Sequence, residues 1–298
     1  MTHRTDRNDA RPSFARNPLV ASVLRENVRI VDGRATIGLW GGWPALLADV
    51  STFGNVLAIS RNPYCVLGSV SEYPEIAAIT CETRGCAVDG SLEFDFACWR
   101  RAIAVAEPRQ AGWLYAVEFS DFGGEVIHKI CLTEQSDFEA FRSWVELNQT
   151  ASGCSRDAAG NPRHSSGLEN SLVLSASGAE SLQTDMLRVM FQMASAERWA
   201  FQAFVGNDGA AQVARMSPSA FCTDGRWIFA GDETTGMHVR VERLAEVFLH
   251  NVGEVLALKA CDPEGHLVCA VAPPLDADCE SWNSRLQGLA REFSIARP

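Results

Sequence analysis

Hydrophobic and polar residues follow two different periods along the chain. Four segments carry apolar residues at helical spacing, which predicts amphipathic helices at residues 43–53, 136–148, 181–196 and 279–293. Most of the chain between them alternates apolar and polar residues in short runs that end in turn-forming residues, which predicts strands joined by tight turns. Because runs of strands joined in this way form antiparallel sheets, we expect an α+β fold rather than βαβ units.

The same pattern occurs twice. The runs VLAISRN and FQAFVGN end in Asn62 and Asn207, 145 residues apart, and SLEFDFACW aligns with GMHVRVERL at the same offset. Further on, YAVEFSDFGGEVIHKI aligns with LALKACDPEGHLVCAV, so that the turn residue Asp121 falls on Asp262. We therefore expect a tandem structural repeat of two large antiparallel β-sheets with flanking helices, related by a pseudo-twofold axis.

The repeat divides the chain into three parts. We expect a first repeat at residues 1–148, which begins with a disordered tail over residues 1–17, and a second repeat at residues 172–298. The linker between them, residues 149–171, is rich in glycine, serine, alanine and asparagine. The closing helix of the first repeat is expected to begin with Ser136 as N-cap and Glu139 three residues later, as in a capping box.

Composition and charge narrow the function classes. The chain has 298 residues, of which 47% are hydrophobic and 21% charged, a globular composition. A net charge of −11 argues against an extended nucleic-acid surface, which needs clustered lysine and arginine. There is neither a signal-peptide pattern nor an apolar run of membrane length. We therefore expect a cytoplasmic protein with no nucleic-acid or membrane partner.

Ten cysteines are scattered through the chain. Several, such as Cys131 and Cys269, lie in apolar strand patterns, which is typical of reduced, buried thiols. The closest pair, Cys81 and Cys86, lacks the second half of a zinc site. The sequence therefore predicts neither a disulfide framework nor structural zinc.

Two histidines lie in the middle of predicted strands. In GMHVRVERL, His238 shares a face with Arg240 and Glu242, because alternate strand residues point to the same side of a sheet. This pattern is typical of a half-exposed strand histidine, and a metal or cofactor ligand is the alternative. His128 in EVIHKICL has a similar setting.

A series of segments resembles a known family. They include WPALLADVSTFGNVLAISRNPYCVLGSVSEYPEI, LEFDFACWRRAIAVAEP, FVGNDGAAQV and RWIFAGDETTGMHVRVERLAEVFL, and they occur in the family's order over residues 43–290. The chain resembles the HemS/ChuS type of cytoplasmic haemin-binding, haemin-degrading factors of bacterial haem uptake. The resemblance implies two pseudo-symmetric antiparallel sheets and a haem in a cleft, held by a histidine near the start of the second repeat and an arginine opposite.

The resemblance also implies candidate ligands for the haem iron. His164, between the repeats, stands near the position of the family's histidine, and His250 is the second candidate. Glu93 occupies the position of the family's arginine, and His250 and Asn251 replace a basic pair. Because the haem propionates need cationic partners when they leave water, a surviving site must draw cations from elsewhere.

Replacement cations are available in the second repeat. Arg215, Arg226 and Arg240 lie on or beside strands that we expect to neighbour one another, and Trp199 is a candidate for the apolar wall of the cleft. For each arginine the alternative is an ordinary surface ion pair, and for the tryptophan it is a place in the core.

Two functions follow from these residues. The chain is a haem-binding protein of haem utilisation that passes haem on, or opens the macrocycle with an external electron donor. Alternatively, it has lost the haem site and acts as a binding or scaffolding protein, with a homodimer interface as one route. Signatures of other chemistries, such as a Walker motif, a dinucleotide-binding glycine motif or a nucleophile elbow, do not occur.

Overall fold

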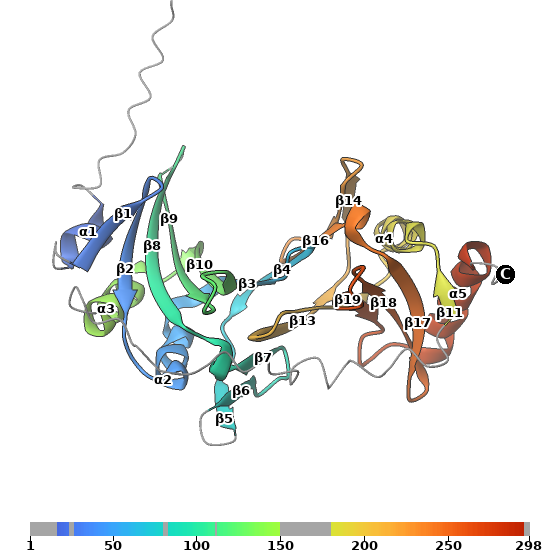
Figure 1. Ribbon diagram of the computed structural model, residues 1–298, viewed down its shortest axis with the longest axis horizontal. Coiled ribbons are helices and arrows are strands. Elements are labelled where there is room, and N and C mark those ends of the chain that lie inside the picture. Colours follow the sequence, from blue (N-terminus) through green and yellow to red (C-terminus); the bar gives the residue numbers. More distant parts are fainter. Residues whose placement is uncertain (1–16, 24–26, 80–82, 111, 150–179, 295–298) are drawn as a thin grey trace, which may run out of the picture.

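Two large antiparallel sheets dominate the structure. The computed structural model describes residues 17–23, 27–79, 83–110, 112–149 and 180–294. A ten-stranded sheet, sheet A, and a nine-stranded sheet, sheet B, lie side by side along the long axis of the molecule (Figure 1). The predicted fold class is confirmed. No described helix is long and apolar enough to cross a membrane.

Sheet A combines strands from both repeats. Seven of its strands come from the first repeat and the last three from the second. In spatial order they are β1 (Val28–Val31), β2 (Arg34–Leu39), β8 (Arg101–Arg109), β9 (Gly112–Ser120), β10 (Val126–Ser136), β3 (Gly54–Arg61), β4 (Cys65–Glu72), β16 (Thr235–Arg240), β15 (Trp227–Gly231) and β14 (Ala220–Thr223).

Sheet B also combines strands from both repeats, but most of them come from the second. Six strands of the second repeat are completed by three strands of the first. In spatial order they are β11 (Glu180–Leu182), β17 (Glu246–Val252), β18 (Val255–Cys261), β19 (Leu267–Ala272), β12 (Phe201–Gly206), β13 (Ala210–Met216), β7 (Leu92–Asp95), β6 (Arg84–Ala87) and β5 (Ile76–Ile79).

The two sheets repeat each other's pairing register. Ser60 faces Leu67 across β3–β4, and Val205 faces Gln212 across β12–β13, each 145 residues later. Where the repeats exchange strands, Leu67 faces Met237 while Gln212 faces Leu92. Apart from β1, which has no counterpart in sheet B, the strand order is therefore the same in both sheets once the three-stranded units β5–β7 and β14–β16 are exchanged, which is the expected result of a pseudo-twofold axis.

A reciprocal pair of asparagines joins the repeats near this exchange. The side-chain amide of Asn62 donates to the carbonyl oxygens of Gly206 (3.0 Å) and Val268 (2.7 Å). Asn207 donates in return to Arg61 (2.7 Å) and Ile127 (2.8 Å). Each asparagine also caps its own turn through Oδ1. The alignment of these two residues in the sequence thus marks the junction between the repeats.

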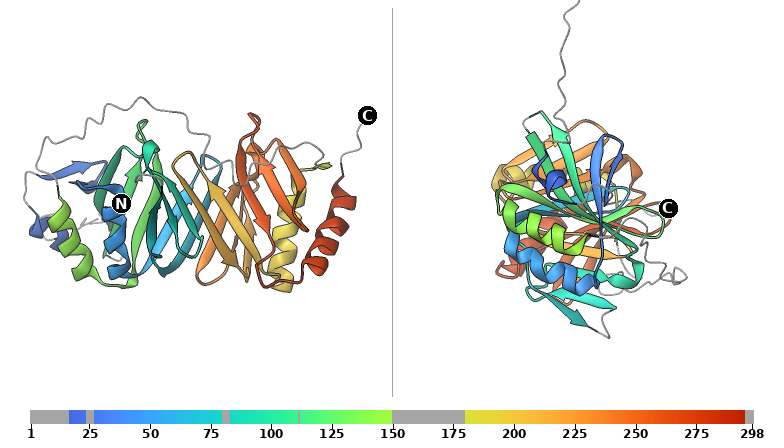
Figure 2. Two further views of the ribbon diagram at one scale, coloured as in Figure 1. Left: turned by 90° about the horizontal axis from the view of Figure 1, so that it is seen from below. Right: turned by 90° about the vertical axis from the view of Figure 1, so that its left-hand side faces the viewer.

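The helices lie at the two ends of the elongated molecule (Figure 2). The predicted helices are observed, with shifted boundaries. Helix α2 is shorter than predicted because a 3-10 helix, η3, replaces its second half, and α4 begins four residues later than predicted because a short strand precedes it. The bounds are α1 (Pro18–Ser22), α2 (Trp43–Ala48), η3 (Asp49–Phe53), η4 (Phe96–Cys98), α3 (Phe138–Asn148), α4 (Asp185–Glu197), η6 (Val241–Arg243) and α5 (Cys279–Phe293).

The N-cap of α3 differs from the prediction. Asp137, not Ser136, accepts hydrogen bonds from the backbone N–H groups of Glu139 and Ala140. Ser136 is the last residue of β10, where its hydroxyl accepts from the N–H of Thr133. The prediction was wrong by one residue because both types are good N-caps and the strand continues through the serine.

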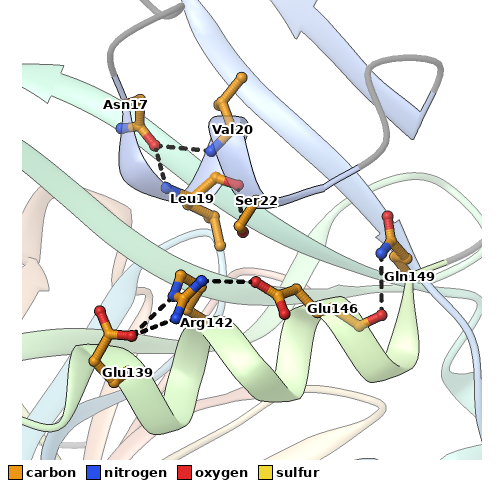
Figure 3. A network of polar contacts seen from close by, with 8 residues as sticks. All are labelled: Asn17, Leu19, Val20, Ser22, Glu139, Arg142, Glu146 and Gln149. Atoms are coloured by element: carbon orange, nitrogen blue, oxygen red, sulfur yellow. Dashed lines mark hydrogen bonds and ion pairs between the residues drawn. The ribbon is translucent and has the colours of Figure 1, made fainter.

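Helix α3 lies beside α1 (Figure 3). Arg142 bonds to Glu139 and Glu146 along α3, and Asn17 caps α1 by accepting from two backbone N–H groups. Asn17 is fully buried, so the end of the predicted disordered tail is ordered. The rest of that tail and the linker beyond Gln149 lie outside the described residues.

Each repeat has its own core. The first core lies between sheet A, helices α2 and α3, and part of β5–β7, and the second lies between sheet B, helices α4 and α5, and part of β14–β16. The exchanged strands therefore pack against the core of the opposite repeat. One face of each sheet is buried in this packing.

Candidate functional site

Sheet B has one face that does not pack on its core. Side chains of alternate residues point to opposite sides, and cross-strand pairs point to the same side. Val247, Leu249 and Leu258 belong to the core that α4 and α5 cover. The opposite side, called the far face of sheet B, carries Glu93, Gln202, Phe204, Ala211, Val213, Arg215, Phe248, His250, Ala257, Lys259 and Ala270.

His250 on β17 has an uncommitted ring nitrogen. Its Nε2 atom is buried and makes no hydrogen bond within the part of the chain that the structure describes. Burial, followed by the positive charge of Lys259, lowers the pKa of His250 below its usual value, so the ring is neutral at pH 7. A neutral imidazole nitrogen without a hydrogen bond is the form that coordinates a metal.

Lys259 on β18 lies beside this histidine on the same face. It is 2% exposed and pairs across the strands with Phe248, while His250 pairs with Ala257. Burial lowers the pKa of Lys259. The sequence analysis did not identify this residue, although a single lysine within the apolar strand LALKAC was a visible signal, because charged residues are seldom buried without a specific role.

Arg215 and Glu93 share the far face of sheet B. Arg215 on β13 forms a bidentate ion pair with Asp276, with both oxygens within 2.9 Å of Nη1, and more than half of its side chain is exposed. Glu93 on β7 pairs with Ala211 of β13. The face therefore holds the buried cation Lys259, the surface cation Arg215, which is already paired with a carboxylate, and the carboxylates Glu93 and Glu246.

Arg226 and Arg240 lie elsewhere. Arg240 ends β16 in sheet A, where it bonds to Glu242 at 2.5 Å and lies over the ring of Trp227. Arg226 precedes β15 in the same sheet and is largely exposed. The expectation that these arginines neighbour Arg215 is wrong, because β14–β16 cross into the other sheet.

Trp199 lies on the helical side of the second repeat. Its ring is 4.7 Å from that of Trp282 on α5, and the guanidinium of Arg285 lies over it at 5.2 Å. It is packed against the core and is not on the far face of sheet B. The structure therefore favours the core interpretation of this residue.

The other histidines have different surroundings. His238 on β16 is exposed and lies 4.7 Å from the ring of Phe229, as a strand histidine on a partly open face. His128 is fully buried, and its ring nitrogens contact the hydroxyls of Ser60 and Tyr73. The expectation that His128 resembles His238 is wrong, because β10 turns this side chain into the first core. His164 lies outside the described residues.

The eight described cysteines are all free thiols. Cys65, Cys131, Cys261 and Cys269 are buried, as the strand patterns predict, and Cys81 lies outside the described residues. The thiols offer no zinc site among the residues described.

Comparison with known proteins agrees with the fold. Residues 24–147 match the family model of the haemin-degrading HemS.ChuX domain. The first repeat is therefore similar to a HemS.ChuX domain. The resemblance inferred from the ordered motifs is thereby confirmed.

Curated relatives match over a limited length. A hemin transport protein HmuS of Yersinia pestis is 32% identical over 33% of this chain and 29% of its own length. A hemin transport protein HemS of Yersinia enterocolitica is 29% identical over 35% of this chain and 31% of its own length. The alignments thus span less than a third of these relatives.

Solved structures match over both repeats. Holo-PhuS, a heme-binding protein from Pseudomonas aeruginosa, has a TM-score of 0.75 at 21% identity over 87% of each chain. The heme degrading enzyme ChuS of Escherichia coli O157:H7 has a TM-score of 0.73 at 16% identity, over 85% of this chain and 86% of its own. At these identities the likeness establishes the two-sheet fold.

Proposed function

We propose that this chain binds haem in the cytoplasm, in the service of haem utilisation, and that it does so on the far face of sheet B. The observation that carries the proposal is the pair of His250 and Lys259 on that face, in a chain whose residues 24–147 match the haemin-degrading HemS.ChuX domain model. An imidazole and a cation are the two groups that haem needs besides an apolar surface.

The residues of the face fit a haem. Phe204, Phe248 and the small residues Ala257 and Ala270 are the apolar side chains that would contact the porphyrin, and the last three are buried. Lys259 supplies a cation for a propionate, because burying an unpaired carboxylate is costly. His250 supplies a donor nitrogen for the iron. When bound, haem supplies the iron and the redox chemistry, and the chain either passes it on or supports its opening with an external electron donor.

His164 is the second proposed iron ligand. It belongs to the segment that joins the repeats, and Gln149, the last described residue before that segment, is bridged to β2. The two ligands make different predictions, because loss of His250 removes a side chain from the far face of sheet B, whereas loss of His164 removes a residue of the segment between the repeats.

A second candidate function is a binding or scaffolding protein without haem, acting as a homodimer or with another partner. Glu93 favours it, because a carboxylate on the far face repels the propionates. The pairing of Arg215 with Asp276 favours it too, because that cation is already neutralised.

The test is a haemin titration of the purified apo-protein, followed by the Soret band. We expect specific binding by the wild type, a changed spectrum in His250→Ala or His164→Ala depending on the ligand, and about tenfold weaker binding in Lys259→Met. His266→Ala is the matched control, because that histidine lies in the β18–β19 turn beside Asp262. Unchanged binding in all three site variants rejects the proposed site, and no specific binding by the wild type favours the second function.

A further inference from the structure

The hairpin turn between β18 and β19 brings together three side chains that can bind a metal ion. Its sequence is Asp262–Pro263–Glu264–Gly265–His266. One donor atom from each of Asp262, Glu264 and His266 lies within 4.8 Å of the other two, which gives two carboxylate oxygens and one imidazole nitrogen. Within the described part of the chain, no other group of three such side chains is this close. Five consecutive residues thus supply a mixed set of donors.

The backbone of the turn fixes the carboxylate of Asp262. The N–H of Gly265 donates to the carbonyl oxygen of Asp262 (3.0 Å), and the φ of Gly265 is +84°, a value that favours glycine. One carboxylate oxygen of Asp262 accepts from the N–H groups of Glu264 (3.0 Å) and His266 (2.8 Å). The other oxygen lies 3.3 Å from Nδ1 of His266. The first oxygen therefore holds the turn, and the second faces the imidazole.

The equivalent turn of the first repeat shows that the two outer donors are not needed for this backbone. Asp121 accepts from the N–H of Glu125 (2.9 Å), and the N–H of Gly124 donates to the carbonyl oxygen of Asp121 (3.2 Å). The φ of Gly124 is +86°, as in the second repeat. Gly123 and Glu125 stand where the second repeat has a glutamate and a histidine. The second repeat therefore carries donor side chains that the folding of the turn does not require.

The spacing of the donors suits a small metal ion. An ion equally distant from three donors 4.8 Å apart lies about 2.8 Å from each, and bonds from zinc to carboxylate oxygen or imidazole nitrogen are about 2.0–2.2 Å long. Each donor therefore has to move by less than about 1 Å to bind the ion. The side chain of His266 is 65% exposed and Glu264 is exposed, so both have room for this movement, whereas Asp262 is buried.

The donor set favours a divalent transition-metal ion over calcium or magnesium. Calcium and magnesium take oxygen ligands, whereas zinc and its first-row neighbours accept imidazole nitrogen together with carboxylate oxygen. Two carboxylates and a neutral imidazole carry two negative charges, which a divalent ion neutralises. Three protein ligands leave the remaining coordination positions of the ion to water.

We infer that the β18–β19 turn is a binding site for a divalent transition-metal ion, with Asp262, Glu264 and His266 as its ligands. Asp262 is the fixed ligand, and the other two side chains close on the ion from the solvent side. The site uses neither His250 nor Lys259, so it does not depend on the haem function proposed above.

The probe for the test is Zn²⁺ alone, titrated into the metal-free full-length protein in competition with a chromogenic zinc chelator. His266→Ala removes one ligand, and Glu264→Gln removes a charge but keeps the shape of the side chain. Asp262 is left unchanged because it also holds the turn. The matched controls are Glu125→Gln in the equivalent turn and His238→Ala, which removes another exposed histidine. Circular dichroism verifies that each variant is folded.

We expect a zinc-binding component that is lost in His266→Ala, weakens at least about tenfold in Glu264→Gln and persists in both controls. The magnitude follows because even the loss of a residue that only hydrogen-bonds to a metal ligand costs about 10–100-fold in affinity. Zinc bound by the exposed thiols of Cys222 and Cys279 is the same in all variants and cancels in the comparison.

The inference is overturned when the wild type takes no zinc from the chelator, when the component survives in His266→Ala and Glu264→Gln, or when the two controls weaken as much as these variants. Haemin binding should be unchanged in His266→Ala and Glu264→Gln, so a failure of the haem proposal and a failure of the zinc site are distinguishable.

Discussion

The buried histidine of the first core predicts a specific loss of stability in acid. His128 is fully buried between the hydroxyls of Ser60 (3.0 Å) and Tyr73 (3.1 Å), each of which can donate or accept. Both nitrogens of a neutral ring are therefore satisfied, whereas a charged ring has no anion beside it. Burial lowers the pKa of His128 from 6.5 to about 3.

The direction of the effect follows from linkage. Between pH 6.5 and 3 the unfolded chain binds a proton at His128 and the folded chain does not. The stabilising contribution is therefore complete above pH 6.5 and is lost as the pH falls toward 3. The limiting slope is about 1.4 kcal/mol per pH unit, and the unfolded histidine is half protonated at pH 6.5, so the free energy of unfolding falls by about 2 kcal/mol over the two units below 6.5 from this group alone.

Urea unfolding at a series of pH values measures this contribution. His128→Gln removes the titration, so its free energy of unfolding, although lower at neutral pH, should fall less steeply in acid by about 2 kcal/mol over the same two units. Carboxylates contribute equally to both proteins and cancel in the difference. Equal slopes for wild type and His128→Gln would refute the reasoning.

Three further predictions concern the junction, the far face of sheet B and the thiols. Asn62→Ala or Asn207→Ala removes two hydrogen bonds to the opposite repeat and should lower the free energy of unfolding by about 2–3 kcal/mol. Asn55→Ala, which removes an exposed hydrogen bond to Gln135, should have a small effect, and equal effects would contradict the junction role. Glu93→Arg should tighten haemin binding because it replaces a repulsive charge by an attractive one, and weaker binding would show the alignment of β7 to be wrong. All ten cysteines should be alkylated in a freshly quenched cell lysate, and disulfides found there by mass spectrometry would reject a reducing location.

Local pattern and internal alignment predicted much of the fold. The hairpin turns at Asp121 and Asp262 are observed as aligned, each aspartate accepting from the N–H four residues later. The exchange of β5–β7 and β14–β16 could not be predicted in this way, because β13 could pair with either β14 or β7 without changing its own alternation. Which strands pair over a long sequence distance depends on how the two cores are covered. The pattern of a single segment does not contain that information.

The exchange of β5–β7 and β14–β16 also explains why some of the predicted site residues do not lie together. Arg215 and Arg240 are close in sequence, but they belong to different sheets. His250 was found because its position matched a substituted basic residue of the family, whereas Lys259 was missed because a search by motif passes over a lone lysine in an apolar strand. Only the structure shows that His250 and Lys259 lie on the same face of neighbouring strands and that Lys259 is buried.

Hydrogen–deuterium exchange of the full-length protein with and without haemin reports where haem binds and does not depend on any variant. We expect haemin to slow the exchange of the amides of β12, β17 and β18, the strands that carry Phe204, His250 and Lys259. Unchanged exchange in these strands at saturating haemin, or protection confined to other parts of the chain, would contradict a haem site on the far face of sheet B.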